Sequence, residues 1–268
     1  MYFDLNIVEK YCKNLPNKFK CLKITITLNL IEKKMNKPIA IITGASTGIG
    51  RSLAIKLSEQ YFIYLISRNK DNLNKTKELI NTKNNDCKII TADISKTDSI
   101  DTIYSQIEHK RKIELLINNA GIGVFKSITD TTIDDWNNTI NTNLRGSFLM
   151  TKMIIDQLKS NQNGKIVFIS SVAGLQPYKN STAYVASKYA IRGFAASLRE
   201  ELREFNIKVL TVFPGAVNTP IWDNKNMGEL REGMMKTDDL TETIFHAINA
   251  PNNCVTEEIT IRRTSGDF

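Results

Sequence analysis

From residue 38 onward, short apolar runs alternate with longer stretches in which apolar residues recur at helical spacing. The short runs are rich in β-branched residues and predict seven strands, at 38–42, 61–66, 87–91, 113–117, 164–169, 207–213 and 258–262. The stretches between them predict helices near 49–59, 71–81, 97–109, 133–160, 183–205 and 238–249. Such alternation is typical of a parallel sheet with helices on both faces. We therefore predict a single α/β domain with a doubly wound, seven-stranded Rossmann fold that binds its ligand at the carboxyl ends of the strands.

The first 34 residues do not join this alternation. Residues 22–30 alternate apolar and polar side chains as a half-buried strand would, but no partner strand is evident. Met35 opens a short segment that leads directly into the first predicted strand. Our hypothesis is that the native protein starts at Met35, or that residues 1–34 are a dispensable extension of a domain formed by residues 35–268. Mass spectrometry of the native N-terminus would decide between these two possibilities.

Composition narrows the classes of function without choosing one. The net charge is +8, and the first 34 residues carry much of it, with seven lysines against three acidic residues. Elsewhere Lys and Arg are interspersed with acidic residues, so we expect no nucleic-acid partner. No apolar run is long enough for a membrane span, and the start lacks the order of a signal peptide. The four cysteines are scattered without metal-ligand spacing, so we expect a cytoplasmic protein with reduced thiols and no metal.

Two motifs carry the candidate chemistry. The glycine loop Gly44-x-x-x-Gly48-x-Gly50 follows the first strand and opens a helix, where backbone N–H groups and the helix N-terminus can hold a pyrophosphate. Further along, Tyr184 and Lys188 lie four residues apart and therefore share one face of a predicted helix. A tyrosine is a poor proton donor or acceptor near neutrality because its reference pKa is about 10, but a neighbouring ammonium lowers that pKa.

These motifs, in this order, resemble the classical short-chain dehydrogenase/reductase family, whose glycine loop has the spacing T-G-x-x-x-G-x-G. The run Asn118-Asn119-Ala120-Gly121 follows the fourth strand, and Pro214-Gly215 follows the sixth strand, with Thr219 close behind. The resemblance covers residues 37–262. It implies an NAD(P)-dependent oxidoreductase that interconverts a carbonyl and a secondary alcohol by hydride transfer.

The resemblance also implies the residues of a cofactor site and of a catalytic tetrad. The implied tetrad is Asn143, Ser171, Tyr184 and Lys188: Tyr184 as acid/base, Lys188 as its electrostatic partner and ribose ligand, Ser171 orienting the substrate oxygen, and Asn143 holding a relay water. Ser170 competes with Ser171, but its spacing to Tyr184 is one residue too long. The implied cofactor contacts are Gly44, Ser46, Thr47, Gly48, Ile49, Gly50, Arg68, Asp93, Ile94, Asn119, Ala120, Gly121, Tyr184, Lys188, Pro214, Gly215, Val217 and Thr219.

The second strand bears on the choice between NAD and NADP. In the family an acidic residue at its end binds the ribose of NAD, whereas a basic residue just beyond it pairs with the extra phosphate of NADP. Here Ser67 stands at the acidic position and Arg68 follows it, which favours NADP because the guanidinium fork suits a phosphate. Thr47 departs from the pattern, since many NADP-preferring relatives carry a second basic residue there.

The sequence defines the substrate and the oligomeric state less well than the cofactor site. A lid is expected near residues 221–236, with apolar Trp222, Met227, Met234 and Met235, which favours a small or medium apolar carbonyl compound. A 3-oxoacyl thioester reductase and an NAD(P)-dependent 3-hydroxy acid dehydrogenase remain alternatives, as does a non-catalytic dinucleotide-binding regulator. The resemblance further implies a homodimer or homotetramer that associates through the two long helices, 133–160 and 183–205.

Overall fold

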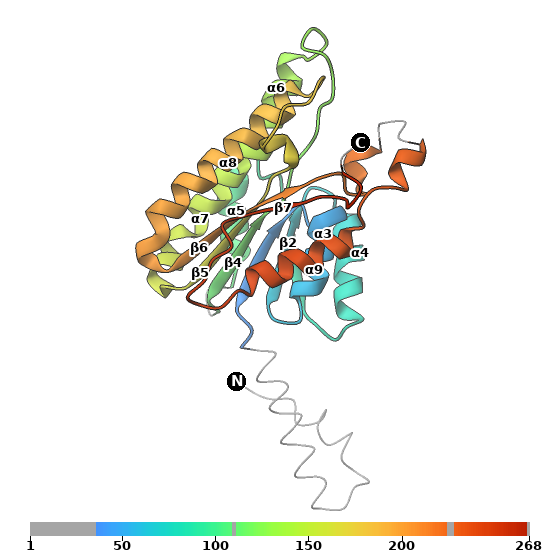
Figure 1. Cartoon of the computed structure of the whole chain (residues 1–268). Helices are drawn as coiled ribbons and strands as arrows, with labels where there is room; N and C mark the ends of the chain where they lie inside the picture. The colour runs from blue at the N-terminus through green and yellow to red at the C-terminus, as the bar shows by residue number, and fades with distance from the viewer. Residues whose placement is uncertain (1–35, 109–110, 224–227, 267–268) are drawn as a thin grey trace, which may run out of the picture. The chain divides into compact units, whose positions relative to one another are not determined.

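Seven parallel strands form one sheet in the computed structural model, which describes residues 36–108, 111–223 and 228–266 (Figure 1). The strand order is β3-β2-β1-β4-β5-β6-β7, and the chain therefore winds outward in both directions from the β1/β4 pair. The strands are β1 (Ile39–Thr43), β2 (Phe62–Ser67), β3 (Cys87–Thr91), β4 (Ile113–Asn118), β5 (Gly164–Ile169), β6 (Ile207–Pro214) and β7 (Glu258–Ile261). The predicted doubly wound, seven-stranded Rossmann fold is confirmed.

Helices cover both faces of the sheet. One face packs against α3 (Gly48–Leu57), α4 (Lys70–Asn81) and α9 (Thr237–Ile248), and the other against α5 (Thr97–Gln106), α7 (Gly146–Asn161) and α8 (Thr182–Leu202) (Figure 1). Parallel strands buried on both faces read as nearly continuous apolar runs, which is why the sequence pattern located them well. β1 is an example, because all five of its residues are buried.

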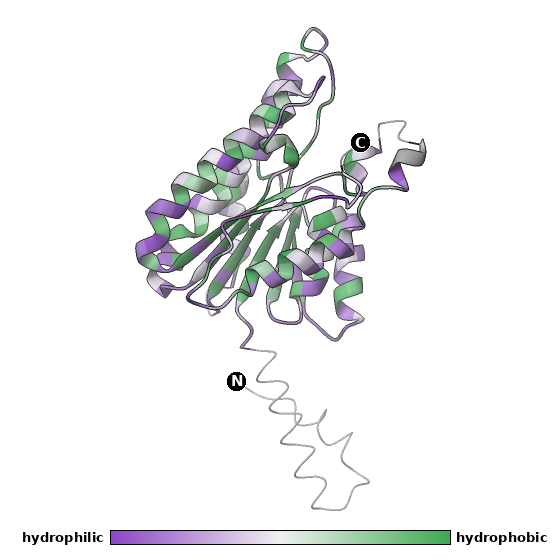
Figure 2. Cartoon of the chain, viewed as in Figure 1, coloured by the Kyte–Doolittle hydropathy of each residue, from purple (hydrophilic) through white to green (hydrophobic). Residues whose placement is uncertain are grey.

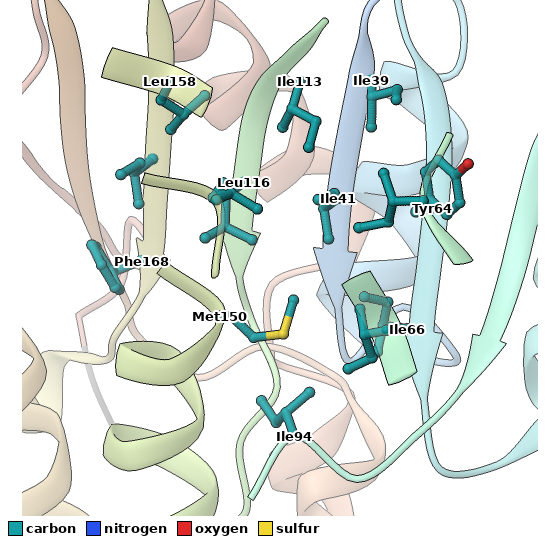
Figure 3. Close-up of a cluster of buried hydrophobic side chains, with 14 of the residues drawn as sticks. Ile39, Ile41, Tyr64, Ile66, Ile94, Ile113, Leu116, Met150, Leu158 and Phe168 are labelled. Atoms are coloured by element: carbon teal, nitrogen blue, oxygen red, sulfur yellow. The ribbon is translucent and has the colours of Figure 1, made fainter. Parts of the chain in front are cut away.

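Each face of the sheet has its own hydrophobic core. In Figure 3, isoleucine, leucine and aromatic side chains of β1, β2, β4 and β5 meet Met150 and Leu158 of α7. The opposite core joins Ala40 and Ile42 of β1 to Leu240 and other apolar residues of α9. Figure 2 shows the same division along the helices, whose apolar positions turn toward the sheet while polar positions turn outward. The two cores fix the strand ends that carry the site.

The predicted helix at 133–160 is not one regular helix. It consists of α6 (Ile133–Ile140), a π-helical turn at Asn141–Arg145, and α7. Insertions of this kind are rare and frequently occur at functional sites, and this one contains Asn143. The predicted helix at 97–109 ends earlier, at Gln106, and α8 passes into a 3₁₀ turn at Arg203–Phe205.

Among the described residues, no helix is both long and apolar enough to cross a membrane. The hypothesis about residues 1–34 lies outside the described residues.

Candidate active site

A cleft of about 680 Å³ runs along the carboxyl ends of the strands. It lies where β1 and β4 are neighbours, the point from which the strand order runs in opposite directions and where such sheets form a crevice. All but two of the predicted site residues line this cleft. The exceptions are Gly50 and Asn143, which lie behind its wall and support residues that form it.

The glycine loop forms one end of the cleft. Gly44 and Gly48 have positive φ angles of 65° and 55°, a conformation that glycine adopts without strain. A Cβ on Gly48 would lie 3.1 Å from Cγ2 of Thr219, so the loop approaches the segment after β6 closely. Helix α3 begins at this loop and carries no acidic residue in its first turn. Its unpaired N–H groups and partial positive charge suit an anion such as a pyrophosphate.

Gly50 contributes to the cleft indirectly. A Cβ at this position would lie 2.4 Å from both the Gly44 oxygen and Nδ2 of Asn119. The same Nδ2 donates hydrogen bonds to the carbonyls of Thr43 (3.0 Å) and Gly44 (3.2 Å). The absence of a side chain at Gly50 therefore lets α3 press against the loop and the end of β4. Its role in the structure is close packing.

Thr43 fixes the relative positions of the β1 and β4 ends. Its hydroxyl donates to the Ile117 carbonyl (3.2 Å) and accepts from the backbone N–H groups of Asn119 (3.0 Å) and Ala120 (3.1 Å). Thr43 was not among the predicted site residues, although it immediately precedes Gly44. The loop after β4 is thus held by one buried hydroxyl at the floor of the cleft.

Arg68 and Asp93 lie on the wall of the cleft near the end of β2. Partial burial acts to raise the pKa of Asp93, but hydrogen bonds from Ser95 and the positive charges of Arg68 and Lys96 outweigh it and lower the pKa. The Ser67 and Ser46 hydroxyls lie 2.9 Å apart beside them. Because position 67 is a serine, Asp93 is the one carboxylate among the described residues that line the cleft, and the positive charge of Arg68 lies close enough to affect it.

Arg51 was missed by the sequence analysis. Its guanidinium lies behind the glycine loop, where it donates to the Ser46 carbonyl and, at 3.0 Å, to Oγ1 of Thr76. Partial burial lowers its pKa. Thr47 supplies no positive charge to the loop, and Arg51 brings one from the following helical turn, although it does not line the cleft. A polar contact between two helices fixes it there, and spacing alone does not reveal that contact.

The inner part of the cleft brings together three of the four tetrad residues. Tyr184 and Lys188 lie on α8, and Nζ of Lys188 is 5.6 Å from the centre of the Tyr184 ring. The ammonium donates a 2.9 Å hydrogen bond to the Ile169 carbonyl at the end of β5. Ser171 follows β5, where its hydroxyl accepts from the Ala173 N–H (3.1 Å) and its side chain hydrogen-bonds Tyr184. A serine, a phenol and an ammonium thus converge on one wall.

Burial dominates the ionisation of this cluster. Desolvation raises the pKa of Tyr184, and the hydrogen bond with Ser171 offsets this only in part. Desolvation also lowers the pKa of Lys188 to about 8. Desolvation therefore outweighs the groups that favour the phenolate, and the pKa of Tyr184 lies above its usual value. The phenol is protonated at neutral pH, which is the state needed to donate a proton to a carbonyl.

The two adjacent serines have different partners. Ser170 is buried and donates from its hydroxyl to the Lys188 carbonyl at 3.2 Å, which ties β5 to the backbone of α8. Ser171 instead interacts with the Tyr184 side chain. The geometry agrees with the choice of Ser171 over Ser170 made from the thirteen-residue spacing.

Asn143 acts as a cross-link in the structure. Its Oδ1 accepts from the Ile122 N–H (2.8 Å), and its Nδ2 donates to the Ile122 carbonyl (3.0 Å) and to the Ser187 hydroxyl (2.9 Å). The Ser187 hydroxyl in turn donates to the Tyr184 carbonyl at 2.7 Å. Both amide hydrogens are used within the protein, so a relay water would have to use an oxygen of Asn143.

Aromatic side chains line the cleft next to Tyr184. The Phe125 ring lies 5.4 Å from the Tyr184 ring and stacks on Trp222 with ring centres 5.4 Å apart and an interplanar angle of 12°. Trp222 belongs to the expected lid. An isolated parallel β-bridge between Val217 and Met235 joins the chain before the lid to the end of the lid. Phe125 was not named from the sequence, because it lies in the loop after Gly121 without belonging to a motif. Met227 lies outside the described residues.

The described part of the chain contains no group of three or more His, Cys, Asp or Glu side chains arranged to hold a metal ion.

The fold and this cleft define a nucleotide-binding oxidoreductase. Residues 38–230 match the family model described as short chain dehydrogenase, and the chain belongs to that family. It is 35% identical over 241 residues to a protein from Chlorobaculum tepidum called sepiapterin reductase, covering 87% of this chain and 98% of that one. An uncharacterised oxidoreductase from Staphylococcus epidermidis is 31% identical over 231 residues, which cover 85% and 98% of the two chains.

Solved structures agree with the assignment. A metagenomic short-chain oxidoreductase in complex with NADP superposes with a TM-score of 0.74 at 26% identity, over 85% of this chain and 97% of that one. An alcohol dehydrogenase from the archaeon Thermococcus sibiricus, complexed with 5-hydroxy-NADP, gives a TM-score of 0.78 at 26% identity with the same coverage. The protein is therefore a short-chain oxidoreductase.

Proposed function

We propose that this protein is an NADP-dependent oxidoreductase that interconverts a carbonyl and a secondary alcohol on a small or medium substrate. The observation that carries the proposal is the convergence of Ser171, Tyr184 and Lys188 on one wall of a cleft that continues to the glycine loop. A half-buried phenol with a raised pKa can donate a proton, and a hydrogen-bonded serine beside it can orient the accepting oxygen.

The residues of the cleft fit a dinucleotide. The α3 N-terminus and the glycine loop would hold the pyrophosphate, and Gly121 lies beside the tetrad, since a Cβ there would lie 3.3 Å from Oδ1 of Asn143. When bound, the reduced nicotinamide supplies the hydride. Ser171 would then orient the substrate oxygen, Tyr184 would donate the proton from its Oη, and Lys188 would bind the ribose and favour the phenolate that remains.

Other functions are less well supported. The name of the Chlorobaculum relative favours carbonyl reduction, and a 3-oxoacyl thioester reductase or a 3-hydroxy acid dehydrogenase would use the same cluster. A non-catalytic dinucleotide-binding regulator has no need for a protonated phenol hydrogen-bonded to Ser171 beside a buried ammonium. The intact cluster therefore favours an enzyme over a regulator.

NADPH should be preferred to NADH across a panel of aldehydes, ketones and 3-oxoacyl thioesters. The reason is Arg68, an exposed cation on the cleft wall beside Ser67 and near Asp93. A charge-assisted hydrogen bond to a phosphate is worth roughly 1.5–3 kcal/mol. We expect Arg68→Leu to raise KM for NADPH about tenfold or more and to leave KM for NADH nearly unchanged.

Lys70→Leu is the matched control for Arg68→Leu, because Lys70 is exposed on the adjacent first turn of α4 but does not line the cleft. It should leave both KM values unchanged. An Arg68→Leu enzyme that still prefers NADPH to the same degree would remove Arg68 from the proposed phosphate site.

We also propose that the protein is a homodimer or homotetramer. The support is a set of large apolar side chains that remain exposed on the two long helices, including Phe148 on α7 (44%) and Tyr189 on α8 (41%). Phe148→Glu should shift the mass measured by light scattering toward a monomer. Leu79→Glu, at an equally exposed position on α4, should leave it unchanged. A wild-type monomer at micromolar concentration would contradict the proposal.

A further inference from the structure

Apart from the glycine-loop end and the catalytic cluster, the described lining of the cleft, here called its outer end, carries one formal charge, the ammonium of Lys179. The other charged side chains that line the cleft are Arg68 and Asp93 near the glycine loop, and Lys188 in the catalytic cluster. The described wall at this end carries no Asp or Glu. Because no acidic side chain balances Lys179 there, the outer end attracts anions and repels cations.

Lys179 is available to a ligand. The side chain is exposed, and within the described part of the chain its ammonium has no hydrogen bond or ion pair. Its backbone is held in place, because its carbonyl accepts a 3.2 Å hydrogen bond from the Ser181 hydroxyl. The preceding Tyr178 also lines the cleft, and its hydroxyl accepts a 2.7 Å hydrogen bond from Gln176. The segment therefore presents the lysine from a defined position at the cleft wall.

Two flat rings also line the cleft. Phe125 and Trp222 are stacked, and the Trp222 indole N–H donates to the Val217 carbonyl at 3.1 Å. Gly123 makes room for them, since a Cβ there would lie 2.7 Å from the Phe125 ring and 3.3 Å from Ile221. An aromatic wall favours a ligand ring in an offset-stacked or edge-to-face arrangement, by roughly 0.5–1.5 kcal/mol beyond area burial.

We propose that the substrate of this enzyme is a carbonyl compound with a planar ring and an anionic group, which bind Phe125–Trp222 and Lys179 respectively. The inference rests on the proposed function for its placement of the carbonyl at Ser171 and Tyr184. It extends that function by assigning the planar ring of the substrate to Phe125 and Trp222 and its anionic group to Lys179.

The test uses three probes that differ in one property at a time. 4-Formylbenzoate has the ring and the anion, its methyl ester lacks the anion, and trans-4-formylcyclohexanecarboxylate keeps the anion without the planar ring. Calorimetry would measure their dissociation constants with the protein saturated with NADP⁺. We expect 4-formylbenzoate to bind about threefold more tightly than the ester, because an exposed ion pair is worth up to about 1 kcal/mol, and to lose this preference in 0.5 M salt.

Substitutions test whether Lys179 and Phe125 cause these binding preferences. Lys179→Gln should bring the ratio of ester to acid dissociation constants close to one, Lys179→Arg should retain it, and Lys75→Gln, at an exposed lysine on α4 away from the cleft, should not change it. Phe125→Leu should reduce the preference for 4-formylbenzoate over the cyclohexane acid, which we expect to be about threefold or more in the wild type.

Binding and turnover separate this inference from the proposed function. A wild-type protein that binds acid and ester equally, or a Lys179→Gln variant that keeps the preference, overturns the inference even if both aldehydes are reduced by NADPH. If the preference follows Lys179 but NADPH reduces no member of the panel of aldehydes, ketones and 3-oxoacyl thioesters, the inference stands and the proposed function fails.

Discussion

Replacing Tyr184 with Phe should reduce kcat for carbonyl reduction about a thousandfold, because a positioned general acid contributes roughly 10²–10⁴ in rate. The substitution removes one oxygen, the one that hydrogen-bonds the Ser171 side chain, and preserves the ring that packs against Phe125. NADPH affinity should therefore change less than twofold. Stopped-flow measurement of NADPH oxidation, together with equilibrium fluorescence titration of NADPH, would report the two quantities on the same preparation.

Tyr189→Phe is the matched control for Tyr184→Phe. It makes the same chemical change on the same helix, at an exposed position outside the cleft. This control should retain full activity. If Tyr184→Phe also retains full activity, the proton donor is another group and the proposed mechanism is wrong.

The second large effect concerns folding of the glycine loop, where Gly50→Ala should destabilise the protein by about 2 kcal/mol. The added methyl would lie 2.4 Å from the Gly44 oxygen and from the Asn119 amide, and the first of these is backbone that cannot rotate away. Relief requires α3 to move off the loop, so we expect NADPH affinity to fall about tenfold as well, because the α3 N-terminus is the anion-binding element. Urea unfolding and NADPH titration would measure both effects.

Gly193→Ala supplies a control with the opposite sign. Gly193 lies inside α8, and a Cβ there would meet no atom within 4 Å. Alanine should stabilise the protein by up to about 1 kcal/mol, since glycine within a helix is unfavourable by that amount. If both substitutions change stability equally, the difference in local packing is not what distinguishes the two glycines.

Much of the fold could be read from the sequence because it depends on local periodicity. Strands buried on both faces appear as apolar runs, and those at 87–91 and 164–169 have the predicted bounds. The helix predicted at 133–160 was less well described, since the π turn at Asn141–Arg145 contains neither Pro nor Gly to mark it in the sequence. An inserted turn of this kind is stabilised by partners elsewhere, here by Ile122 and Ser187 on either side of Asn143.

In the candidate site, too, some residues could be predicted from local spacing, whereas others depend on contacts with distant parts of the chain. The glycine loop, Ser171, Tyr184 and Lys188 were recognised because short-range spacing places them at a strand end or on one helix face. Gly50 and Asn143 were also predicted, but they lie behind the cleft wall, where their packing and hydrogen bonds depend on residues far away in the chain. Arg51, Phe125 and Lys179 were not among the site residues named from the sequence.

By itself, the sequence determined the order of the chemical groups along the chain: a phosphate-binding loop first, then a serine, then a tyrosine and lysine on one helix face. Only the tertiary structure decided which groups are desolvated. Burial raises the pKa of Tyr184 and lowers that of Lys188, which reverses the direction expected for the tyrosine. Tertiary contacts also decided the Phe125–Trp222 stack. Desolvation and stacking depend on what surrounds a side chain in space, and neither is encoded in spacing along the chain.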